Sequence, residues 1–412
     1  MKKYLLIFYL LVNAFSLLGQ EFKVVGYLPY YRFDIIENID FEKITHLNLA
    51  FLNPDIDGNL SIGGWDIDPI VLHARSKNPE LKVFISLAGG GVTEEWSKAY
   101  DKFLMPEHRS EFAHLLVEYV QHHELDGIDV DLEWSHVNEY YSPFVIELAD
   151  SLRSHGKEIS AALPGTHRYA DLSEEALDAY DFINLMAYDK TGPWRPNDPG
   201  PHSPREFAVQ SIAFWRSEGL EDARMTLGVP FYGYDFTNQS NVTAFTFGSL
   251  TKEDENLAYK DQDGQRYYNG IPTIQYKTYY ALNQVSGIMI WELGQDAFGA
   301  NSKYSLLSAI DLVVTTGILP VTGVDEKLLS NTNHQITIYP NPFQNQVTFL
   351  ANHELRNCNI KILDTHGRII LSEIITSNSN ERSYDFSEIP MGVYILSIEI
   401  NGEILRKKLL KN

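Results

Sequence analysis

The sequence has 412 residues, of which 44% are hydrophobic and 21% charged, so it is too apolar for a disordered chain and long enough for one large and one small domain. Its 33 lysines and arginines against 55 aspartates and glutamates give a net charge of −22. This charge repels polyanions and argues against nucleic acid and acidic membrane surfaces as partners, whereas a neutral glycan meets no such repulsion.

The first residues predict an export signal. Met1-Lys2-Lys3 is followed by the apolar run 4–18, which is too short to cross a bilayer comfortably. We therefore expect residues 1–20 to form a signal peptide. The alternative is an apolar first helix of the domain, but a strand-like pattern begins directly at Glu21. No other stretch predicts a membrane span.

Short β-rich runs then alternate with longer segments of helical character. Most runs are nearly continuous in Val, Ile, Leu and Phe, which is typical of parallel strands covered on both faces. Eight such units over residues 21–316 predict an α/β fold, a closed (β/α)8 TIM barrel. The predicted strands cover residues 22–28, 44–52, 82–87, 127–132, 158–163, 182–187, 225–231 and 287–291.

Two of the intervening segments show the helical pattern clearly. Residues 110–121 and 142–154 carry apolar side chains at helical spacing and are expected in the outer ring of helices. In the second segment, Ser142 followed by Pro143 predicts a cap and a first helical residue.

After the barrel the composition changes. Residues 317–333 contain Pro320, Gly323 and a polar run, and they predict a linker. Residues 334–412 hold strand-like runs without helices between them, joined by turn signals, and they predict a small all-β sandwich. The lone cysteine, Cys358, excludes an internal disulfide, so the fold must depend on burial.

The fourth predicted strand carries three acids. Asp129, Asp131 and Glu133 alternate with apolar residues, so a strand places all three on one face, which in a barrel points into the lumen. Glu133 comes last, at the carboxyl end, where the active sites of this architecture lie. Ionising three crowded carboxyls together costs free energy because like charges repel, so we expect one to keep its proton near neutral pH. Such a group can protonate a glycosidic leaving oxygen.

Two other interpretations fit the acidic pattern less well. The same alternation occurs in ordinary solvent-facing strands, but a central barrel strand has no solvated face. Three carboxylates could also bind calcium, but a calcium loop needs a turn and a glycine between its ligands, and the intervening Ile, Val and Leu provide neither. We therefore expect no metal and no cofactor.

Together the strand ends resemble glycoside hydrolase family 18, the chitinases and related endo-N-acetylglucosaminidases. Asp126-Gly-Ile-Asp-Val-Asp-Leu-Glu133 resembles the DGxDxDxE signature of that family. Ser86-Leu-Ala-Gly-Gly90 is similar to its SxGG element, and Met186-Ala-Tyr-Asp189 to its MxYD element. Residues 227–233 and Trp291-Glu292 also match, in the right order. The resemblance covers residues 22–296.

This resemblance implies substrate-assisted hydrolysis, in which the N-acetyl group of the sugar is the nucleophile. Glu133 would protonate the leaving oxygen and then act as base on water. Asp131 would orient the acetamido group and stabilise the oxazolinium ion, and Asp129 would take up charge or a proton from Asp131. Tyr188 would donate its hydroxyl to the acetamido oxygen.

The family pattern also implies a cleft lining. Trp291 would form the floor beneath the sugar, since the apolar face of a pyranose packs on an indole. The competing interpretation is a core tryptophan at a strand end for Trp291 and a purely structural packing role for the other residues. The remaining lining residues would be Tyr27, Phe51, Met186, Asp189 and Tyr232, with Ser86, Gly89, Gly90 and Asp126 as supporting residues.

Two departures from the family pattern stand out. Many chitinases follow the acid with Tyr-Pro, whereas this chain has Trp134-Ser135. Residues 234–284 look short for the extra α+β lobe that deepens the groove of some processive members. We therefore expect a shallow cleft, and processive action is in doubt.

The tail has a resemblance of its own. Residues 338–342, 392–396 and 407–411 resemble the C-terminal sorting domain of the bacterial type IX secretion system, which implies that machinery as a partner and a secreted or cell-surface location. The alternative is a carbohydrate-binding sandwich, but the tail has no tryptophan to stack on sugar.

Three functions follow from the sequence. The first is hydrolysis of chitin or chito-oligosaccharides, the second is an endo-β-N-acetylglucosaminidase acting on N-glycans or peptidoglycan fragments, and the third is a catalytically silent lectin. The presence of Glu133, Asp131 and Tyr188 together argues against the lectin. We expect the protein to act as a monomer.

Overall fold

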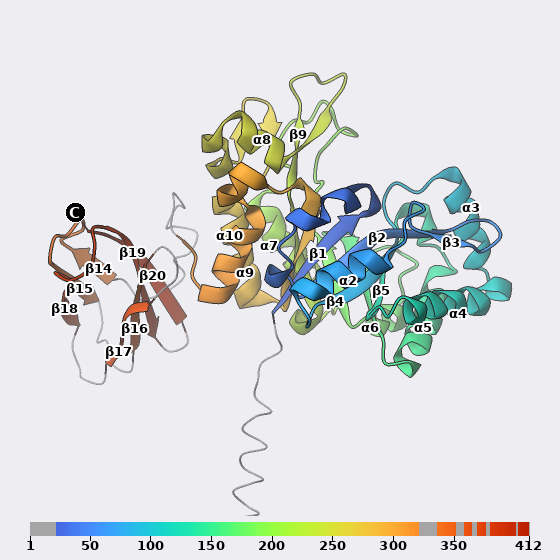
Figure 1. Ribbon diagram of the computed structural model, residues 1–412, viewed down its shortest axis with the longest axis horizontal. Coiled ribbons are helices and arrows are strands. Elements are labelled where there is room, and N and C mark those ends of the chain that lie inside the picture. Colours follow the sequence, from blue (N-terminus) through green and yellow to red (C-terminus); the bar gives the residue numbers. More distant parts are fainter. Residues whose placement is uncertain are drawn as a thin grey trace, which may run out of the picture. The chain divides into compact units, whose positions relative to one another are not determined.

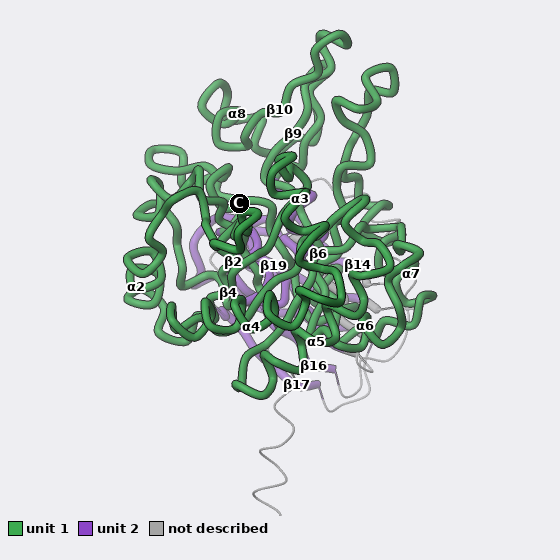
Figure 2. Tube along the Cα trace, turned by 90° about the vertical axis from the view of Figure 1, so that its right-hand side faces the viewer, with its two compact units in different colours: residues 1–270, 280–307 green, residues 271–279, 308–412 purple. Residues whose placement is uncertain are grey.

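The computed structural model describes residues 22–320, 336–351, 358–364, 369–375, 380–400 and 403–411 (Figure 1). The predicted signal peptide and most of the predicted linker lie outside these residues. The chain divides into two compact units, one of residues 1–270 and 280–307 and the other of residues 271–279 and 308–412 (Figure 2). The predicted domain boundaries remain predictions.

The first unit contains a closed barrel of eight parallel strands, which confirms the predicted fold class. Neighbouring strands pair in the order β1-β13-β8-β7-β6-β5-β4-β2, and β1 also pairs with β2 to close the ring. Each predicted strand overlaps one of these eight. They are β1 (Lys23–Pro29), β2 (His46–Pro54), β4 (Lys82–Ala88), β5 (Gly127–Asp131), β6 (Glu158–Pro164), β7 (Phe182–Met186), β8 (Met225–Pro230) and β13 (Gly287–Trp291).

The barrel strands are buried along nearly their whole length, because helices cover the outside and side chains fill the lumen. The chain also contains short 3-10 turns between these elements. The α-helices are α2 (Asp68–Lys77), α3 (Glu94–Phe103), α4 (Pro106–His122), α5 (Tyr141–Ser154), α6 (Glu174–Ala179), α7 (Arg205–Ser217), α8 (Phe247–Glu253), α9 (Ile271–Gln284) and α10 (Leu306–Thr316).

Both segments predicted as helices are helical, within α4 and α5, but the predicted cap is wrong. Helix α5 begins at Tyr141, so Ser142 lies inside it. The Ser142 hydroxyl instead donates to the carbonyl of Asp171 at 2.6 Å and accepts the backbone N–H of Ser173 at 2.9 Å. Its role is therefore to tie α5 to the loop before α6.

A small antiparallel sheet lies between β8 and β13, in the segment that looked short for an extra lobe. Its strand order is β10-β9-β12-β11. Figures 1 and 2 both show β9 and α8 projecting from the top of the first unit. The strands are β9 (Tyr232–Asp235), β10 (Thr243–Thr246), β11 (Gln262–Asp263) and β12 (Arg266–Tyr267); a further short strand, β3 (Leu60–Ser61), pairs with β2.

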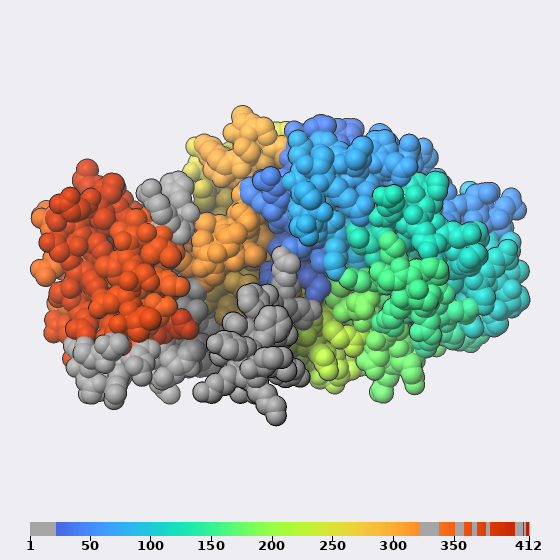
Figure 3. All heavy atoms as spheres, turned by 60° about the horizontal axis from the view of Figure 1, so that its bottom comes forward, coloured from blue at the N-terminus to red at the C-terminus, as the bar shows by residue number. Residues whose placement is uncertain are grey.

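The C-terminal strands form two antiparallel sheets, as predicted. The first has the order β14-β15-β18 and the second β17-β16-β19-β20, and apolar residues of both sheets share one core. In the space-filling view the described atoms of these strands form a compact red body (Figure 3). The strands are β14 (Ile336–Tyr339), β15 (Gln346–Ala351), β16 (Cys358–Asp364), β17 (Ile369–Ile375), β18 (Glu381–Asp385), β19 (Gly392–Ile400) and β20 (Glu403–Lys411).

The described part of the chain holds the helices α2 to α10. Within it, no helix combines the length and hydropathy that a membrane crossing requires.

Candidate active site

The three acids of β5 project from consecutive inward positions at its carboxyl end. Asp129 and Asp131 lie within the strand and are buried, with 0% and 4% exposure. Glu133 follows two residues later in extended backbone (φ −124°, ψ 165°), so the alternation continues past the last ladder hydrogen bond. Sequence spacing therefore translates directly into a row of carboxyls.

Asp129 accepts four hydrogen bonds from four different strands. The Tyr27 and Ser86 hydroxyls each donate to Oδ2 at 2.7 Å. The Ser160 hydroxyl donates to Oδ1 at 2.7 Å and the Asn184 amide to the same oxygen at 3.1 Å. Burial raises the pKa of the Asp129 carboxyl, while these donors act in the opposite direction.

Asp131 has the opposite surroundings. Its Oδ1 is buried and has no hydrogen-bond partner among the described residues. Burial first, and then the charges of Glu133 and Asp129, hold the pKa of Asp131 well above its usual range. The Asp131 carboxyl is thus a buried group that is costly to ionise while its neighbours are charged.

Glu133 is largely buried and has a raised pKa. Burial of its side chain, followed by the nearby charge of Asp189, raises the pKa of Glu133 to about 7. A carboxyl with that pKa is substantially protonated at neutral pH and can still release its proton.

Two glycines make room for the site. A Cβ added to Gly90 would lie 2.7 Å from Oε1 of Glu133, so a side chain there would have to displace the carboxyl. Gly89 has a positive φ of 78°, and a Cβ there would lie 2.4 Å from the Phe51 ring. The backbone after β4 therefore packs directly against Glu133 and Phe51.

Asp126 lies away from the other predicted residues. It precedes β5, at the opposite end from Glu133. Its Oδ2 accepts two hydrogen bonds of 2.7 Å, one from the Arg75 guanidinium and one from the backbone N–H of Val83. The structure therefore places Asp126 as a support for the start of β4 and β5, and does not bring it to the carboxyl row.

Aromatic rings surround the carboxyls. Trp291, at the end of β13, stacks on Phe51 with ring centres 5.6 Å apart and 23° between the planes. It meets Tyr27 edge-on at 5.5 Å. Tyr188 is buried, and burial followed by the charge of Asp131 holds its pKa well above the usual range, so its hydroxyl remains a donor. Met186 packs into the same cluster.

Asp189 is held by residues that no motif indicated. Besides Tyr232, which donates to its Oδ1, the Tyr234 hydroxyl donates to that oxygen at 3.1 Å. The His202 Nδ1 lies 3.3 Å from Asp189 Oδ1, and its Nε2 lies 3.2 Å from the carbonyl of Tyr232. Asp189 has a positive φ of 59°, so this carboxylate is fixed in an unusual backbone conformation.

Three polar residues of the barrel lumen were also missed. Ser160 and Asn184 contact Asp129, and Thr226 contacts Asn184. A signal did exist, because Asn184 is two residues before Met186, on the same strand face. Trp134, which departs from the family pattern, is 69% exposed and has a positive φ of 56°.

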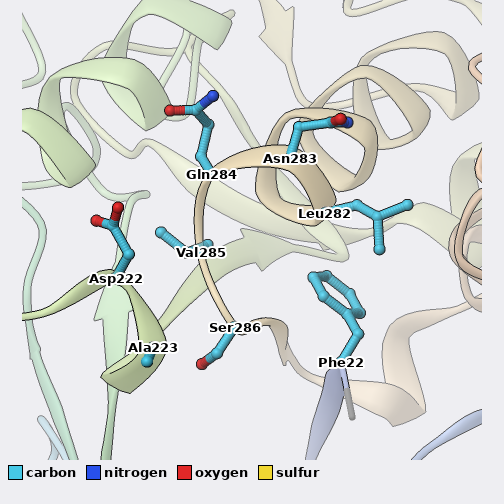
Figure 4. A pocket seen from close by; sticks show the side chains of 8 residues that line it. All are labelled: Phe22, Asp222, Ala223, Leu282, Asn283, Gln284, Val285 and Ser286. Atoms are coloured by element: carbon cyan, nitrogen blue, oxygen red, sulfur yellow. The ribbon is translucent and has the colours of Figure 1, made fainter. Parts of the chain in front are cut away.

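A pocket lies away from the carboxyl row. It has a volume of about 360 Å³ and is lined by Phe22, Asp222, Ala223 and residues 282–286 (Figure 4). These residues lie at or before the first residues of β1, β8 and β13, the opposite end of the barrel from Glu133. Among the described residues, no three His, Cys, Asp or Glu side chains are grouped as metal ligands.

Comparison with known proteins identifies the family. Residues 23–296 match the model of the glycosyl hydrolases family 18. The chain belongs to glycosyl hydrolase family 18. Residues 337–412 match the secretion system C-terminal sorting domain, so this family 18 protein is exported to the cell surface or beyond it.

Solved structures of the family are similar to this chain. The GH18 chitinase ChiB from the chitin utilization locus of Flavobacterium johnsoniae is 46% identical, with a TM-score of 0.70, over 72% of this chain and 95% of that one. A chitinase from Bacteroides thetaiotaomicron is 26% identical, with a TM-score of 0.63, over 71% of this chain and 96% of that one.

Curated relatives are more distant. "Probable chitinase 10" of Drosophila melanogaster is 25% identical over 72% of this chain, which spans 16% of that much longer protein. "Chitinase-3-like protein 2" of Homo sapiens is 24% identical, over 71% of this chain and 92% of that protein.

Proposed function

We propose that this family 18 protein hydrolyses β-1,4-linked N-acetylglucosamine polymers, either chitin or chito-oligosaccharides, with retention of configuration. The observation that carries the proposal is the row Asp129, Asp131 and Glu133, in which the pKa of Glu133 is raised to about 7 by burial and by Asp189. Similarity to proteins named as chitinases supports the choice of polymer.

The first chemical step needs an acid and an internal nucleophile. Glu133 donates its proton to the leaving glycosidic oxygen, while the acetamido carbonyl oxygen of the sugar attacks the anomeric carbon and forms an oxazolinium ion. The Asp131 carboxyl accepts a hydrogen bond from the acetamido N–H, and the Tyr188 hydroxyl donates one to the acetamido oxygen. These contacts hold the nucleophile beneath the anomeric carbon.

The second step reverses the role of the acid. Glu133, now a carboxylate, removes a proton from water as the water attacks the anomeric carbon, which opens the ring of the oxazolinium ion and restores the acetamido group. Two displacements at one carbon retain its configuration. The stacked Trp291 and Phe51 supply the apolar floor on which the sugar rests.

The test compares two substrates. The secreted protein is incubated with N-acetylchitohexaose and, separately, with a high-mannose glycopeptide, and the products are identified by mass. We expect shorter chito-oligosaccharides from the first and no change in the second. Cleavage of the glycopeptide alone would favour the endo-β-N-acetylglucosaminidase, and binding without product from either substrate would favour the lectin.

We also propose that the C-terminal sandwich engages the type IX secretion machinery and that one chain is the active species. The match of residues 337–412 to a secretion sorting domain supports the first point. All members of the carboxyl row and its aromatic floor come from one chain, which supports the second.

A further inference from the structure

A line of buried polar side chains crosses the barrel lumen from β8 to Asp129. The Thr226 hydroxyl donates to Oδ1 of Asn184 at 2.6 Å. The Asn184 amide nitrogen in turn lies 3.1 Å from Oδ1 of Asp129 and 3.1 Å from the Tyr27 hydroxyl. All four side chains are buried. The family motifs assigned no role to Thr226 or Asn184.

Thr226 determines which way the Asn184 amide points. An amide has one accepting and one donating end, and the Thr226 hydroxyl engages the accepting end. The donating end must then face Asp129 and Tyr27. In the reverse orientation the amide oxygen would face a carboxylate oxygen at about the same distance, and two acceptors repel each other.

The hydrogen-bond donors around Asp129 favour its ionised form. A carboxylate offers about four lone-pair positions, and Asp129 accepts hydrogen bonds from Tyr27, Ser86, Ser160 and Asn184. A proton on either oxygen would displace one of these donors. On Asp131 the buried Oδ1 has no partner among the described residues, so a proton there displaces no hydrogen bond.

We propose that Asn184, oriented by Thr226, is a positioning residue that keeps Asp129 ionised. The inference rests on the proposed function, in which Asp131 meets the acetamido group. Asp131 is the neighbouring carboxyl that can hold a proton without losing a hydrogen bond at its Oδ1.

The other titratable groups near Asp129 stay neutral. Four tyrosines interact electrostatically with Asp129. Burial is the main cause that raises the pKa of each above its usual range, so none of them ionises in an ordinary assay. They are Tyr27 on β1, Tyr141 on α5, Tyr180 before β7 and Tyr188 after β7. The remaining titratable neighbours are Asp131 and, beyond it, Glu133.

The decisive variant is Thr226→Val, which removes the hydroxyl and keeps the shape. The freed amide of Asn184 can then present its oxygen to Asp129. Because the carboxylate loses a donor, its pKa rises. We expect kcat on N-acetylchitotetraose to fall about tenfold, the loss of one buried hydrogen bond, with KM little changed and the acidic limb of the pH profile moved to higher pH.

Thr251→Val is the matched control. It makes the same substitution at a buried threonine whose hydroxyl donates to the carbonyl of Gly248 at 3.1 Å, in α8. It should leave the pH profile in place. Asn184→Leu is a second variant with the same expected shift. If that variant does not fold, Thr226→Val alone decides.

A readout without turnover separates this inference from the proposed function. Aspartate labelled with ¹³C at the side-chain carboxyl is followed by NMR as the pH changes, with Asp129→Asn and Asp131→Asn used for assignment. We expect an ionised Asp129 and a protonated Asp131 at neutral pH. A protonated Asp129, or superimposable profiles for Thr226→Val and Thr251→Val, would overturn the inference. Failure to hydrolyse any oligosaccharide would overturn the proposed function while the NMR titration still stands.

Discussion

The pKa of Glu133 is raised to about 7 because two features of its surroundings act in the same direction. Its carboxyl is largely buried, and Asp189 places a negative charge nearby. Asp189 is itself held by tyrosine hydroxyls and by His202. The residues around Asp189 therefore take part in setting the acid strength of Glu133, although Asp189 lies on a different strand end.

The first prediction concerns pH. Because the acid must be protonated and its pKa is about 7, kcat/KM should fall as the pH rises through that value. Asp189→Asn removes the negative charge, which lowers the pKa of Glu133, so the same fall should begin at lower pH. Initial rates on a chito-oligosaccharide across the pH range measure this basic limb for the wild type and for Asp189→Asn. An unshifted basic limb in Asp189→Asn would mean that Asp189 does not act on Glu133.

The second prediction removes the acid itself. Glu133→Gln deletes one ionisable group and changes little volume, so the fold and glycan binding should persist while kcat falls by at least about 100-fold. Turnover and calorimetric binding of N-acetylchitotetraose measure the two properties. Turnover at the wild-type rate would remove Glu133 from the mechanism.

The third prediction tests the close approach of the backbone to the acid. A methyl group on Gly90 would lie 2.7 Å from Glu133 Oε1, so Gly90→Ala must displace the carboxyl. We expect kcat to fall about 10–100-fold, as for a misplaced catalytic group. Gly91→Ala is the control, since a Cβ there meets nothing within 4 Å. Equal activity of the two variants, measured with thermal melts to exclude unfolding, would contradict the argument.

At the scale of elements, the barrel could be predicted because its strands are strongly apolar and regularly spaced. The same regularity revealed the acids of β5, since period two continues through Glu133 into extended backbone. It should also have revealed Asn184, which shares a face of β7 with Met186. A polar residue within an apolar run is itself a signal, because a buried amide needs hydrogen-bond partners.

Other elements carried no usable signal. The strands of the sheet between β8 and β13 are only two to four residues long, too short for a periodic pattern to appear. The cap predicted at Ser142 followed a local rule, but the hydroxyl found a tertiary partner in the carbonyl of Asp171. Likewise the match of Asp126 to the family signature did not reveal that it serves the start of the strand.

At the scale of the molecule, the chain divides its tasks between its two ends. Residues 23–296 match a glycosidase family and residues 337–412 a secretion sorting domain. The sandwich has its own core, including Val347, Ile360 and Leu396. Its last strand is fixed by Lys411, whose ammonium group donates to the carbonyls of Phe386 at 2.7 Å and Ile389 at 2.6 Å. Because this core consists of sandwich residues alone, we expect the sandwich to fold separately from the barrel.

The last prediction follows from that separation. Truncation after residue 320 keeps every barrel strand and α10 and removes the sandwich, so hydrolysis of N-acetylchitohexaose by the purified fragment should match that of the full chain. Export should fail, because the fragment lacks the sorting domain. Activity is measured in the medium and in lysed cells of a bacterium that carries the type IX system, with Glu133→Gln as the inactive control. If the fragment appears in the medium, residues 321–412 are not required for export. If the fragment is insoluble, the barrel depends on those residues to fold.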